Sequence, residues 1–298
     1  MKNLFADFKS GFAAILGAPN VGKSTLLNRM LGEKISITSR KPQTTRNKII
    51  GVCHLPKAQI VFLDTPGIHA AKDIFNKKMV ESALSSIADT DLILLVTDIT
   101  KPDSVSEKLL LKTLSSTNKP IIALLNKIDR NKTINVESAI DQWEKAYSFT
   151  AVIPISAKFG LGIDKLIQTL LKLLPPGPPF FPEDTLTDMP MRFIAAEIIR
   201  EKIFRLTGEE IPYAVAVTVE KFEEKENLAV IHTVIHVEKE SQKGIIIGKK
   251  GQMLKKIGQD ARTDIEKWMG HQVFLHLFVR VQKNWSKDTK ALRRFGYS

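Results

Sequence analysis

The stretch that decides the fold of this chain reads Gly17-Ala18-Pro19-Asn20-Val21-Gly22-Lys23-Ser24. It matches the pattern G-x-x-x-x-G-K-[ST] and stands between an apolar run, Phe12–Leu16, and a helical pattern, Thr25–Met30. A strand before such a loop and a helix after it form the context in which its backbone N–H groups and the helix N-terminus bind phosphate. The stretch therefore predicts a nucleoside-triphosphate site within an α/β domain.

The residues of this phosphate-binding loop have separate expected roles. Lys23 should reach the β- and γ-phosphates, and the Ser24 hydroxyl should ligate Mg²⁺. Gly17 and Gly22 allow the backbone to approach phosphate because they carry no Cβ atom. We expect the whole loop, together with Thr25 at the start of the helix, to line the nucleotide.

A second motif, Asp64-Thr65-Pro66-Gly67, follows the strand candidate Gln59–Leu63. A carboxylate at the end of a strand near the phosphate-binding loop can hold the Mg²⁺ shell. The Gly67 N–H can bond the γ-phosphate and so respond to hydrolysis. At this distance from the loop, the pattern D-x-x-G indicates a nucleotide-dependent switch.

The segment between these two motifs, Pro42-Gln43-Thr44-Thr45-Arg46, corresponds to the first switch of GTPases. In that class a threonine of this segment ligates Mg²⁺ only when the γ-phosphate is present. We favour Thr45 over Thr44 by a narrow margin. Lys23, Thr45 and Gly67 are the residues to which we assign catalysis.

The base is specified by a third motif, Asn126-Lys127-Ile128-Asp129, at the end of the strand candidate Ile121–Asn126. The Asp129 carboxylate can accept hydrogen bonds from guanine N1–H and the 2-amino group together, whereas adenine would leave it unpaired. Lys127 is expected to lie along the base and to support the phosphate-binding loop. Ser156-Ala157-Lys158, after the strand candidate Ala151–Ile155, completes the base pocket and can also cap the following helix.

The position after Gly67 is occupied by Ile68. Many Ras-like GTPases place a glutamine there to orient the attacking water, which an apolar side chain cannot do. Hydrolysis should therefore be slow, or depend on the backbone, an ion or a partner. Asn20 suggests the ion, because GTPases with a similar loop often use this asparagine to hold K⁺. Mg²⁺ and K⁺ are thus the candidate cofactors.

Strands and helices alternate up to about Leu174, which predicts a mainly parallel sheet flanked by helices over residues 1–174. Another strand candidate in this part is Leu92–Thr97. Residues 175–182 then contain five prolines in eight positions, which neither a helix nor a central strand accommodates. We interpret residues 175–185 as an interdomain linker of semi-rigid polyproline character.

The charge of the chain is concentrated near its end. The net charge of the 298 residues is +12, and residues 241–298 hold 13 Lys+Arg against 4 Asp+Glu, a difference of +9. Such asymmetry indicates a polyanionic partner, either nucleic acid or an anionic membrane. The single cysteine, Cys53, excludes a disulfide framework, and no apolar run approaches the roughly 18 residues of a membrane span.

Residues 186–298 change to the element order α-β-β-α-α-β, which predicts a smaller α+β domain with a basic C-terminal tail. The expected helices and strands are Arg192–Leu206, Tyr213–Glu220, Leu228–Val237, Gln252–Met269 and Val273–Val281, with a glycine-punctuated turn at Gly244–Gly251. We expect Trp143, Trp268 and Trp285 to serve packing, with the last the least certain because it lies in the basic tail.

Within the turn, Gly248-Lys249-Lys250-Gly251 forms the pattern G-x-x-G before a long helix. In KH domains this loop clamps the backbone of about four nucleotides, and the element order is that of type II KH domains. Glycines allow close approach, and lysines neutralise phosphates. The candidate RNA contacts are these four residues with Ile246, Ile247, Leu254 and Lys255; core packing is an equally good interpretation of the three apolar ones.

These motifs together resemble the Era family of bacterial GTPases over essentially the full chain. The resemblance implies binding of GTP and GDP, hydrolysis of GTP, and binding of the 3′ end of small-subunit (16S) ribosomal RNA through the KH domain. It further implies a role in assembly and maturation of the 30S subunit, and a cytoplasmic location with peripheral inner-membrane association. We expect a monomer. The segments that carry the resemblance are Gly17–Ser24, 43–46, 64–67, Asn126–Asp129, 156–158, 180–184, Gly244–Gly251 and 295–297.

Two other functions stay open on the sequence. A regulatory GTPase could dock its basic C-terminus on an anionic membrane, although the apolar residues of Gln252–Met269 suit packing on a small sheet better. The other open function is a passive RNA-binding protein whose nucleotide fold is vestigial. Against it, the residues that bind nucleotide are intact: Lys23, Ser24, Asp64 and Asp129.

Overall fold

The chain divides into two compact units, Met1–Asp188 and Met189–Ser298. The computed structural model describes residues 7–39, 41, 44–68, 74–130, 135–208 and 210–297. No helix within these ranges is long and apolar enough to cross a membrane. The two units are considered separately below.

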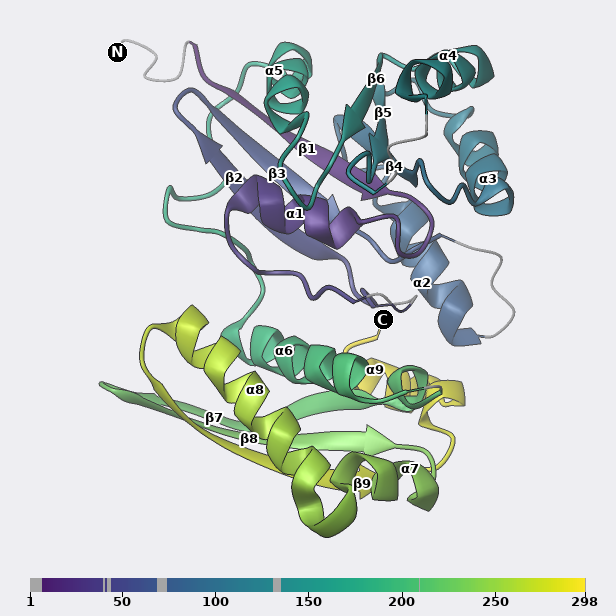
Figure 1. Ribbon diagram of the computed structural model, residues 1–298. Coiled ribbons are helices and arrows are strands. Elements are labelled where there is room, and N and C mark those ends of the chain that lie inside the picture. The colour runs from purple at the N-terminus through teal and green to yellow at the C-terminus, as the bar shows by residue number, and fades with distance from the viewer. Residues whose placement is uncertain are drawn as a thin grey trace. The chain divides into compact units, whose positions relative to one another are not determined.

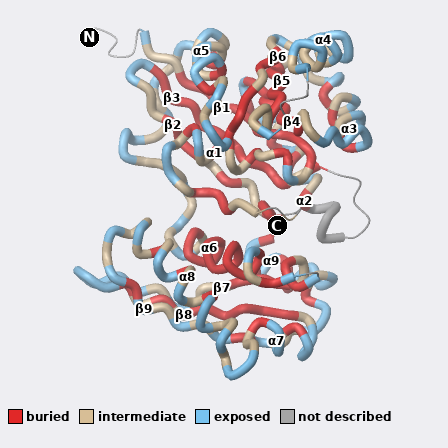
Figure 2. The backbone as a smooth tube through the Cα atoms, viewed as in Figure 1, coloured by how far each residue is buried: buried red, intermediate tan, exposed pale blue. Residues whose placement is uncertain are grey.

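The first unit is built on a six-stranded sheet in the order β2-β3-β1-β4-β5-β6 (Figure 1). Only β2 is antiparallel to its neighbour; the other pairs are parallel. Three central strands are buried along their whole length (Figure 2), as in sheets covered by helices on both faces. The strands are β1 (Lys9–Leu16), β2 (Ile49–Leu55), β3 (Ala58–Asp64), β4 (Leu92–Asp98), β5 (Ile121–Asn126) and β6 (Ala151–Ile155). The helices are α1 (Lys23–Leu31), α2 (Ile74–Ser85), α3 (Ser104–Leu114), α4 (Val136–Ala146) and α5 (Ile163–Leu173).

The parallel register brings the motifs to one edge of the sheet. Ile15, just before the phosphate-binding loop, is paired with Asp64, and Asp98 is paired with Asn126. Asn126 is in turn paired with Ile155, just before the last base motif. Because parallel strands end at the same edge, segments more than 100 residues apart meet there.

All five predicted strands of this unit exist, but β2 was not predicted. The sequence of β2, IIGVCHL, is interrupted by Gly51 and His54 and lacks a clear period. It becomes a strand through its antiparallel pairing with β3, to which Pro56 and Lys57 connect it. Strand structure at a sheet edge depends on the partner strand more than on local propensity.

The segment predicted as a linker lies against the first unit. Gln59 of β3, almost fully buried, binds it at three points: its Oε1 accepts from Phe180 N (2.7 Å) and Phe181 N (2.9 Å), and its Nε2 donates to Phe181 O (2.7 Å). Farther along, Val52 N donates to Leu186 O at 2.9 Å. The division between the units therefore falls after this segment, at Asp188 and Met189.

The second unit has a three-stranded sheet in the order β7-β8-β9, with β7 antiparallel and β9 parallel to β8. Two long helices pack on one face of this sheet (Figure 1). The observed order α-β-β-α-α-β confirms the predicted fold class. The elements are α6 (Met191–Leu206), β7 (Ala216–Lys225), β8 (Leu228–Val237), α7 (Glu240–Ile247), α8 (Gln252–Met269), β9 (Gln272–Val281) and α9 (Thr289–Arg294), with 3₁₀ turns at Ile211–Ala214, Lys249–Gly251 and Trp285–Lys287.

Two boundaries of the second unit were predicted wrongly. Tyr213 belongs to a 3₁₀ turn that contains Pro212, and the strand begins only at Ala216. Gly244 lies inside α7, so the glycine turn begins at Gly248. A proline fixes its own φ and a mid-helix glycine is tolerated at a modest cost, which explains both shifts.

The basic C-terminal tail is part of the folded second unit. Trp285 is fully buried, and its indole Nε1 donates to Ala214 O at 3.1 Å, which confirms the packing role. Phe295 and Tyr297 are buried, and the Phe295 ring lies 4.3 Å from that of His236. Burial and the nearby Arg280 and Arg294 lower the pKa of His236 to about 4.

Candidate nucleotide-binding site and glycine loop

The phosphate-binding loop connects β1 to α1. Gly22 has a φ of 106°, and a Cβ there would lie 2.3 Å from the Asn126 side-chain nitrogen, so only glycine fits. The Lys23 ammonium donates to Gly17 O (3.0 Å) and Ala18 O (2.9 Å). Burial lowers the pKa of Lys23 to about 8, against the opposing effect of the Asp64 carboxylate. The loop thus holds a buried cation where phosphate is expected.

Three oxygen-bearing side chains that were expected to hold Mg²⁺ gather beside this loop. Ser24 Oγ and Thr45 Oγ1 lie 2.8 Å apart. Asp64 is fully buried, and its Oδ1 has no hydrogen-bond partner within the described ranges. Burial raises the pKa of Asp64, although the Lys23 charge acts in the opposite direction. Hydroxyl and carboxylate oxygens suit a hard divalent cation, and a buried carboxylate oxygen without a donor fits a metal site.

The preference for Thr45 over Thr44 as the Mg²⁺ ligand is supported by the hydrogen-bond partners of the two hydroxyls. Thr45 faces Ser24, whereas the Thr44 hydroxyl donates to Lys41 O at 2.8 Å. The hydroxyl of Thr44 is therefore engaged in its own turn. Pro42 and Gln43 of the predicted switch lie outside the described residues.

The D-x-x-G segment lies directly against the phosphate-binding loop. A Cβ on Gly67 would approach Pro19 Cα to 2.7 Å, so the backbones are in contact there. Thr65 Oγ1 donates to Ile15 O at 2.8 Å, and Ile68 N donates to Gly17 O at 3.1 Å. The Ile68 side chain is buried in the core of the unit. It therefore takes no part in orienting water, as its chemistry already indicated.

In the base pocket, the side chains of Asp129 and Ser156, both predicted to belong to it, are in contact. Ser156 Oγ donates to Asp129 Oδ1 at 2.5 Å. Lys127 Nζ donates to Asn20 O at 2.6 Å, which fits its expected support of the phosphate-binding loop. Asp129 is thereby positioned with one oxygen bound by Ser156, at the end of the sheet where the base is expected.

Asn126 joins two loops of the site. Its Nδ2 donates to Val21 O at 2.7 Å, and its Oδ1 accepts from Ala157 N at 3.0 Å. These bonds tie the phosphate-binding loop to the Ser156–Lys158 loop. They use one of the two hydrogens of Nδ2, so they are compatible with the predicted nucleotide contact.

Two residues of the site were missed by sequence reasoning. Asp98, at the end of β4, forms an ion pair with Lys127 at 2.5 Å. Burial alone would raise the pKa of Asp98, but hydrogen bonds from Lys127 and Thr100 lower it. Arg29 of α1 donates to Ala157 O at 3.3 Å. The position of Asp98 at the end of a predicted strand was a signal that could have revealed it. Nothing in the sequence marks Arg29.

The glycine loop of the second unit turns sharply between α7 and α8. Gly248 has φ 70° and ψ 176°, Lys250 has φ 51°, and Gly251 has φ 76°. A Cβ on Gly248 would lie 2.6 Å from Met253 Cβ. Lys249, Lys250 and Lys255 are exposed, so their charges point to solvent. The loop thus offers backbone and positive charge to a partner.

The apolar RNA candidates do not behave alike. Ile246 is completely buried in the core of the unit, so the prediction that it contacts RNA is wrong for this conformation. It faces inward because α7 packs this side on the sheet. Ile247 and Leu254 are partly buried at the edge of the same core and keep some exposed surface.

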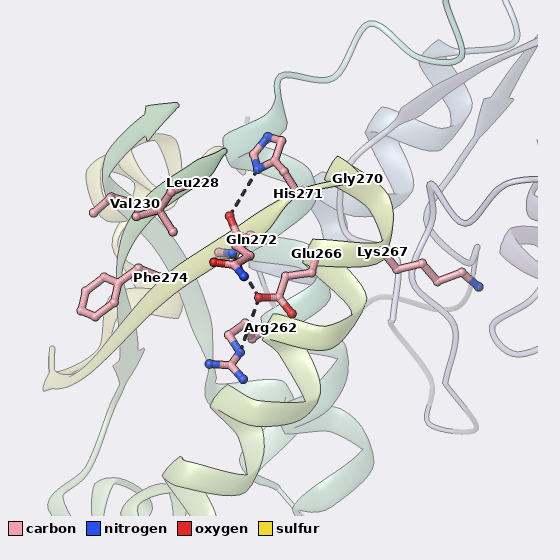
Figure 3. A pocket seen from close by; sticks show the side chains of 10 residues that line it. Leu228, Val230, Arg262, Glu266, Lys267, Gly270, His271, Gln272 and Phe274 are labelled. Carbon is pink, nitrogen blue, oxygen red and sulfur yellow. Dashed lines mark hydrogen bonds and ion pairs between the residues drawn. The ribbon is translucent and has the colours of Figure 1, made fainter. Parts of the chain in front are cut away.

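A hollow lies at the other end of α8, where β9 begins (Figure 3). Arg262, Glu266 and Phe274 are among its lining residues, and none of the predicted nucleotide or RNA residues is. Glu266 Oε1 accepts from Val273 N at 3.1 Å and lies 3.7 Å from Arg262 Nε. Arg262 and Glu266 therefore form an ion pair at the wall of the hollow.

Comparison with known proteins agrees with this division into a nucleotide site and a glycine loop. A family model described as 50S ribosome-binding GTPase matches residues 12–127, and one described as KH domain matches residues 210–286. GTPase Era of Geobacter metallireducens is 53% identical over 293 residues, which cover 98% of both chains. The chain belongs to the Era family of GTPases. GTPase Era of Carboxydothermus hydrogenoformans is 47% identical, over 98% of this chain and 99% of the relative.

Solved Era structures share the fold of both units. A crystal structure of Era in complex with MgGDPNP and nucleotides 1506–1542 of 16S ribosomal RNA has a TM-score of 0.93 at 45% identity, over 98% of this chain and 99% of that one. A crystal structure of an Aquifex aeolicus Era variant bound to GDP.AlF4- gives the same score and identity. This Era-family chain is therefore a GTPase with a KH domain.

Proposed function

We propose that this Era-family GTPase uses its nucleotide state to control binding of 16S ribosomal RNA, and that it acts in assembly and maturation of the small ribosomal subunit. The observation that carries the proposal is the presence, in one chain, of Asp129 held by Ser156 at the predicted base pocket and of an exposed, lysine-bearing glycine loop. The solved Era that holds both MgGDPNP and 16S RNA supports the same pairing.

The choice of the small ribosomal subunit rests on the comparison that covers more of the chain. The family model that names the 50S subunit covers residues 12–127 only, which is the nucleotide-binding part shared by many GTPases. The Era bound to 16S RNA covers 98% of this chain, including the KH domain. We therefore propose the 3′ region of the small-subunit RNA as the partner.

The residues proposed for each step are those that the geometry brings together. Lys23, Ser24 and the loop backbone bind the phosphates, while Asp129 with Ser156 reads guanine. When Mg²⁺ is bound by Ser24, Thr45 and Asp64, it supplies positive charge to the phosphates. Gly67 N–H reports the γ-phosphate, which couples hydrolysis to the switch segments. RNA would bind along the Gly248–Gly251 loop.

Short single-stranded RNA from the 3′ end of 16S RNA is expected to accelerate GTP hydrolysis by the full chain. The variant Gly248→Asp/Gly251→Asp should lose this acceleration, because it places negative charge where phosphate lies and strains a backbone with positive φ. Steady-state phosphate release with and without RNA measures the effect. Gly244→Asp is the matched control, since a Cβ there meets no atom within 4 Å.

Hydrolysis without RNA should be unchanged in all three proteins. If RNA bound normally but never changed turnover, the KH domain would be a tether and the coupling part of the proposal would fail. If no RNA bound, the RNA partner itself would be wrong.

We further propose that K⁺ supplies positive charge for hydrolysis, at a site where Ile68 offers no polar side chain. The basis is the loop sequence Gly17–Ser24, because GTPases with a similar loop often hold K⁺ with the asparagine that stands here as Asn20. Hydrolysis in K⁺ buffer is expected to exceed that in Na⁺ buffer by roughly tenfold or more, since one preorganised charge can supply that much. Asn20→Ala should remove the difference; equal rates of the unaltered protein in the two buffers would rule out the ion.

Location and oligomeric state rest on the family resemblance. We propose a monomer in the cytoplasm that associates with the 30S subunit and, peripherally, with the inner membrane.

A further inference from the structure

A buried serine in the loop after α1 contacts the carboxylate of the proposed magnesium site. Ser36 is 0% exposed, and its hydroxyl donates to Asp64 Oδ2 at 2.8 Å. Asp64 Oδ1 is buried and has no hydrogen-bond partner in the described part of the chain. The two oxygens of one carboxylate are therefore distinguished: Ser36, one donor to this carboxylate beside Ser24 and the Thr65 backbone, binds Oδ2, whereas Oδ1 can accept a cation.

The backbone of Ser36 is fixed to α1 by a single side chain. Asn28 Oδ1 accepts from Ile35 N (3.0 Å) and Ser36 N (2.9 Å), and Asn28 Nδ2 donates to Ser36 O (2.7 Å). Ile35 and Ile37 on either side are buried. Since α1 begins at the phosphate-binding loop, the Ser36 hydroxyl keeps a fixed place relative to that loop.

We propose that Ser36 is a positioning residue for the magnesium site, orienting the Asp64 carboxylate so that Oδ1 faces the cation bound by Ser24 and Thr45, while Asn28 holds Ser36 in place. This inference rests on the proposed metal site and adds to it a residue outside every recognised motif. Groups that orient a metal-binding carboxylate typically change metal affinity by 10- to 100-fold when removed.

A purely structural role for Ser36 predicts a different outcome. A buried hydroxyl that only satisfied a buried carboxylate would affect the stability of the fold, and the affinity for metal would not change. Metal binding and thermal stability therefore have to be measured on the same variants.

The test is Mn²⁺ binding to the full chain loaded with GDPNP, which keeps a γ-phosphate, followed by electron paramagnetic resonance of free Mn²⁺. Ser36→Ala is expected to weaken Mn²⁺ binding by about 10- to 100-fold. Ser36→Cys, of similar size but a weak donor, should fall between Ser36→Ala and the unaltered protein. Ser39→Ala is the matched control: it lies in the same loop, and its hydroxyl accepts from Lys41 N.

A fourth variant, Asp64→Asn, separates this inference from the site on which it rests. If Asp64→Asn bound Mn²⁺ as the unaltered protein does, the proposed metal site would be wrong. If Asp64→Asn weakened binding but Ser36→Ala did not, the site would stand and the role of Ser36 would be refuted. Should Ser36→Ala fail to fold, Ser36→Cys decides, and unaltered affinity there overturns the inference.

Discussion

Asp129→Asn is expected to change the base preference of this GTPase from guanine to xanthine. The substitution turns one carboxylate acceptor into an NH₂ donor, which then opposes the 2-amino group of guanine. One hydrogen bond to a charged group is lost and two N–H donors face each other, which corresponds to about a 10²- to 10⁴-fold weaker affinity for GDP. Xanthine carries an oxygen in place of that amino group, so the asparagine pairs with it and affinity for XDP should rise correspondingly.

Fluorescent GDP and XDP titrations of the same protein measure the change. Ser156 Oγ donates to Asp129 Oδ1, so the new side chain can keep the same orientation with its carbonyl oxygen there. Asp164→Asn, an exposed aspartate in the first turn of α5, is the control and should keep the guanine preference. A loss of GDP affinity without any gain for XDP would mean that Asp129 shapes the pocket without reading the base.

The nucleotide site could be predicted largely from the sequence because each of its parts is local. The loop Gly17–Ser24 needs only its own glycines and the following helix, and Asp129 needs only its place after a strand. The parallel sheet then brings these parts to one edge. Asn126 shows the limit of this reasoning, because its two partners, Val21 and Ala157, are distant in sequence and only the fold reveals them.

What the sequence could not indicate depends on contacts between distant segments. Ser36 looks like an ordinary loop serine until the fold places it beside Asp64. The proline-rich segment looked like a free linker because its hydrogen-bond partner, Gln59, is more than 100 residues away. Ile246 could face a groove or the core, and the packing of α7 decided for the core.

The helix α6 contains a buried ion pair between Arg200 and Glu197. Arg200 is completely buried, and its guanidinium donates to Glu197 Oε1 (2.7 Å) and Oε2 (2.5 Å). Burial alone would lower the pKa of Arg200, but Glu197 raises it, so the pair stays charged. A two-point bond of this kind is the geometry in which a buried ion pair is tolerated.

Arg200→Met is therefore expected to lower the free energy of unfolding of this unit by about 3–5 kcal/mol, because Glu197 would keep a buried charge without its cation. Glu197→Gln/Arg200→Met should recover part of the loss, since it removes both charges. Urea unfolding of the full chain, followed by tryptophan fluorescence in a Trp143→Phe background, measures these changes in unfolding free energy. The remaining tryptophans, Trp268 and Trp285, both lie in the second unit.

Lys256→Met in α8 provides the control. Lys256 pairs with Asp260, and both side chains are partly exposed, so its loss should cost less than about 1 kcal/mol. If Arg200→Met were no more damaging than Lys256→Met, the buried pair would contribute little.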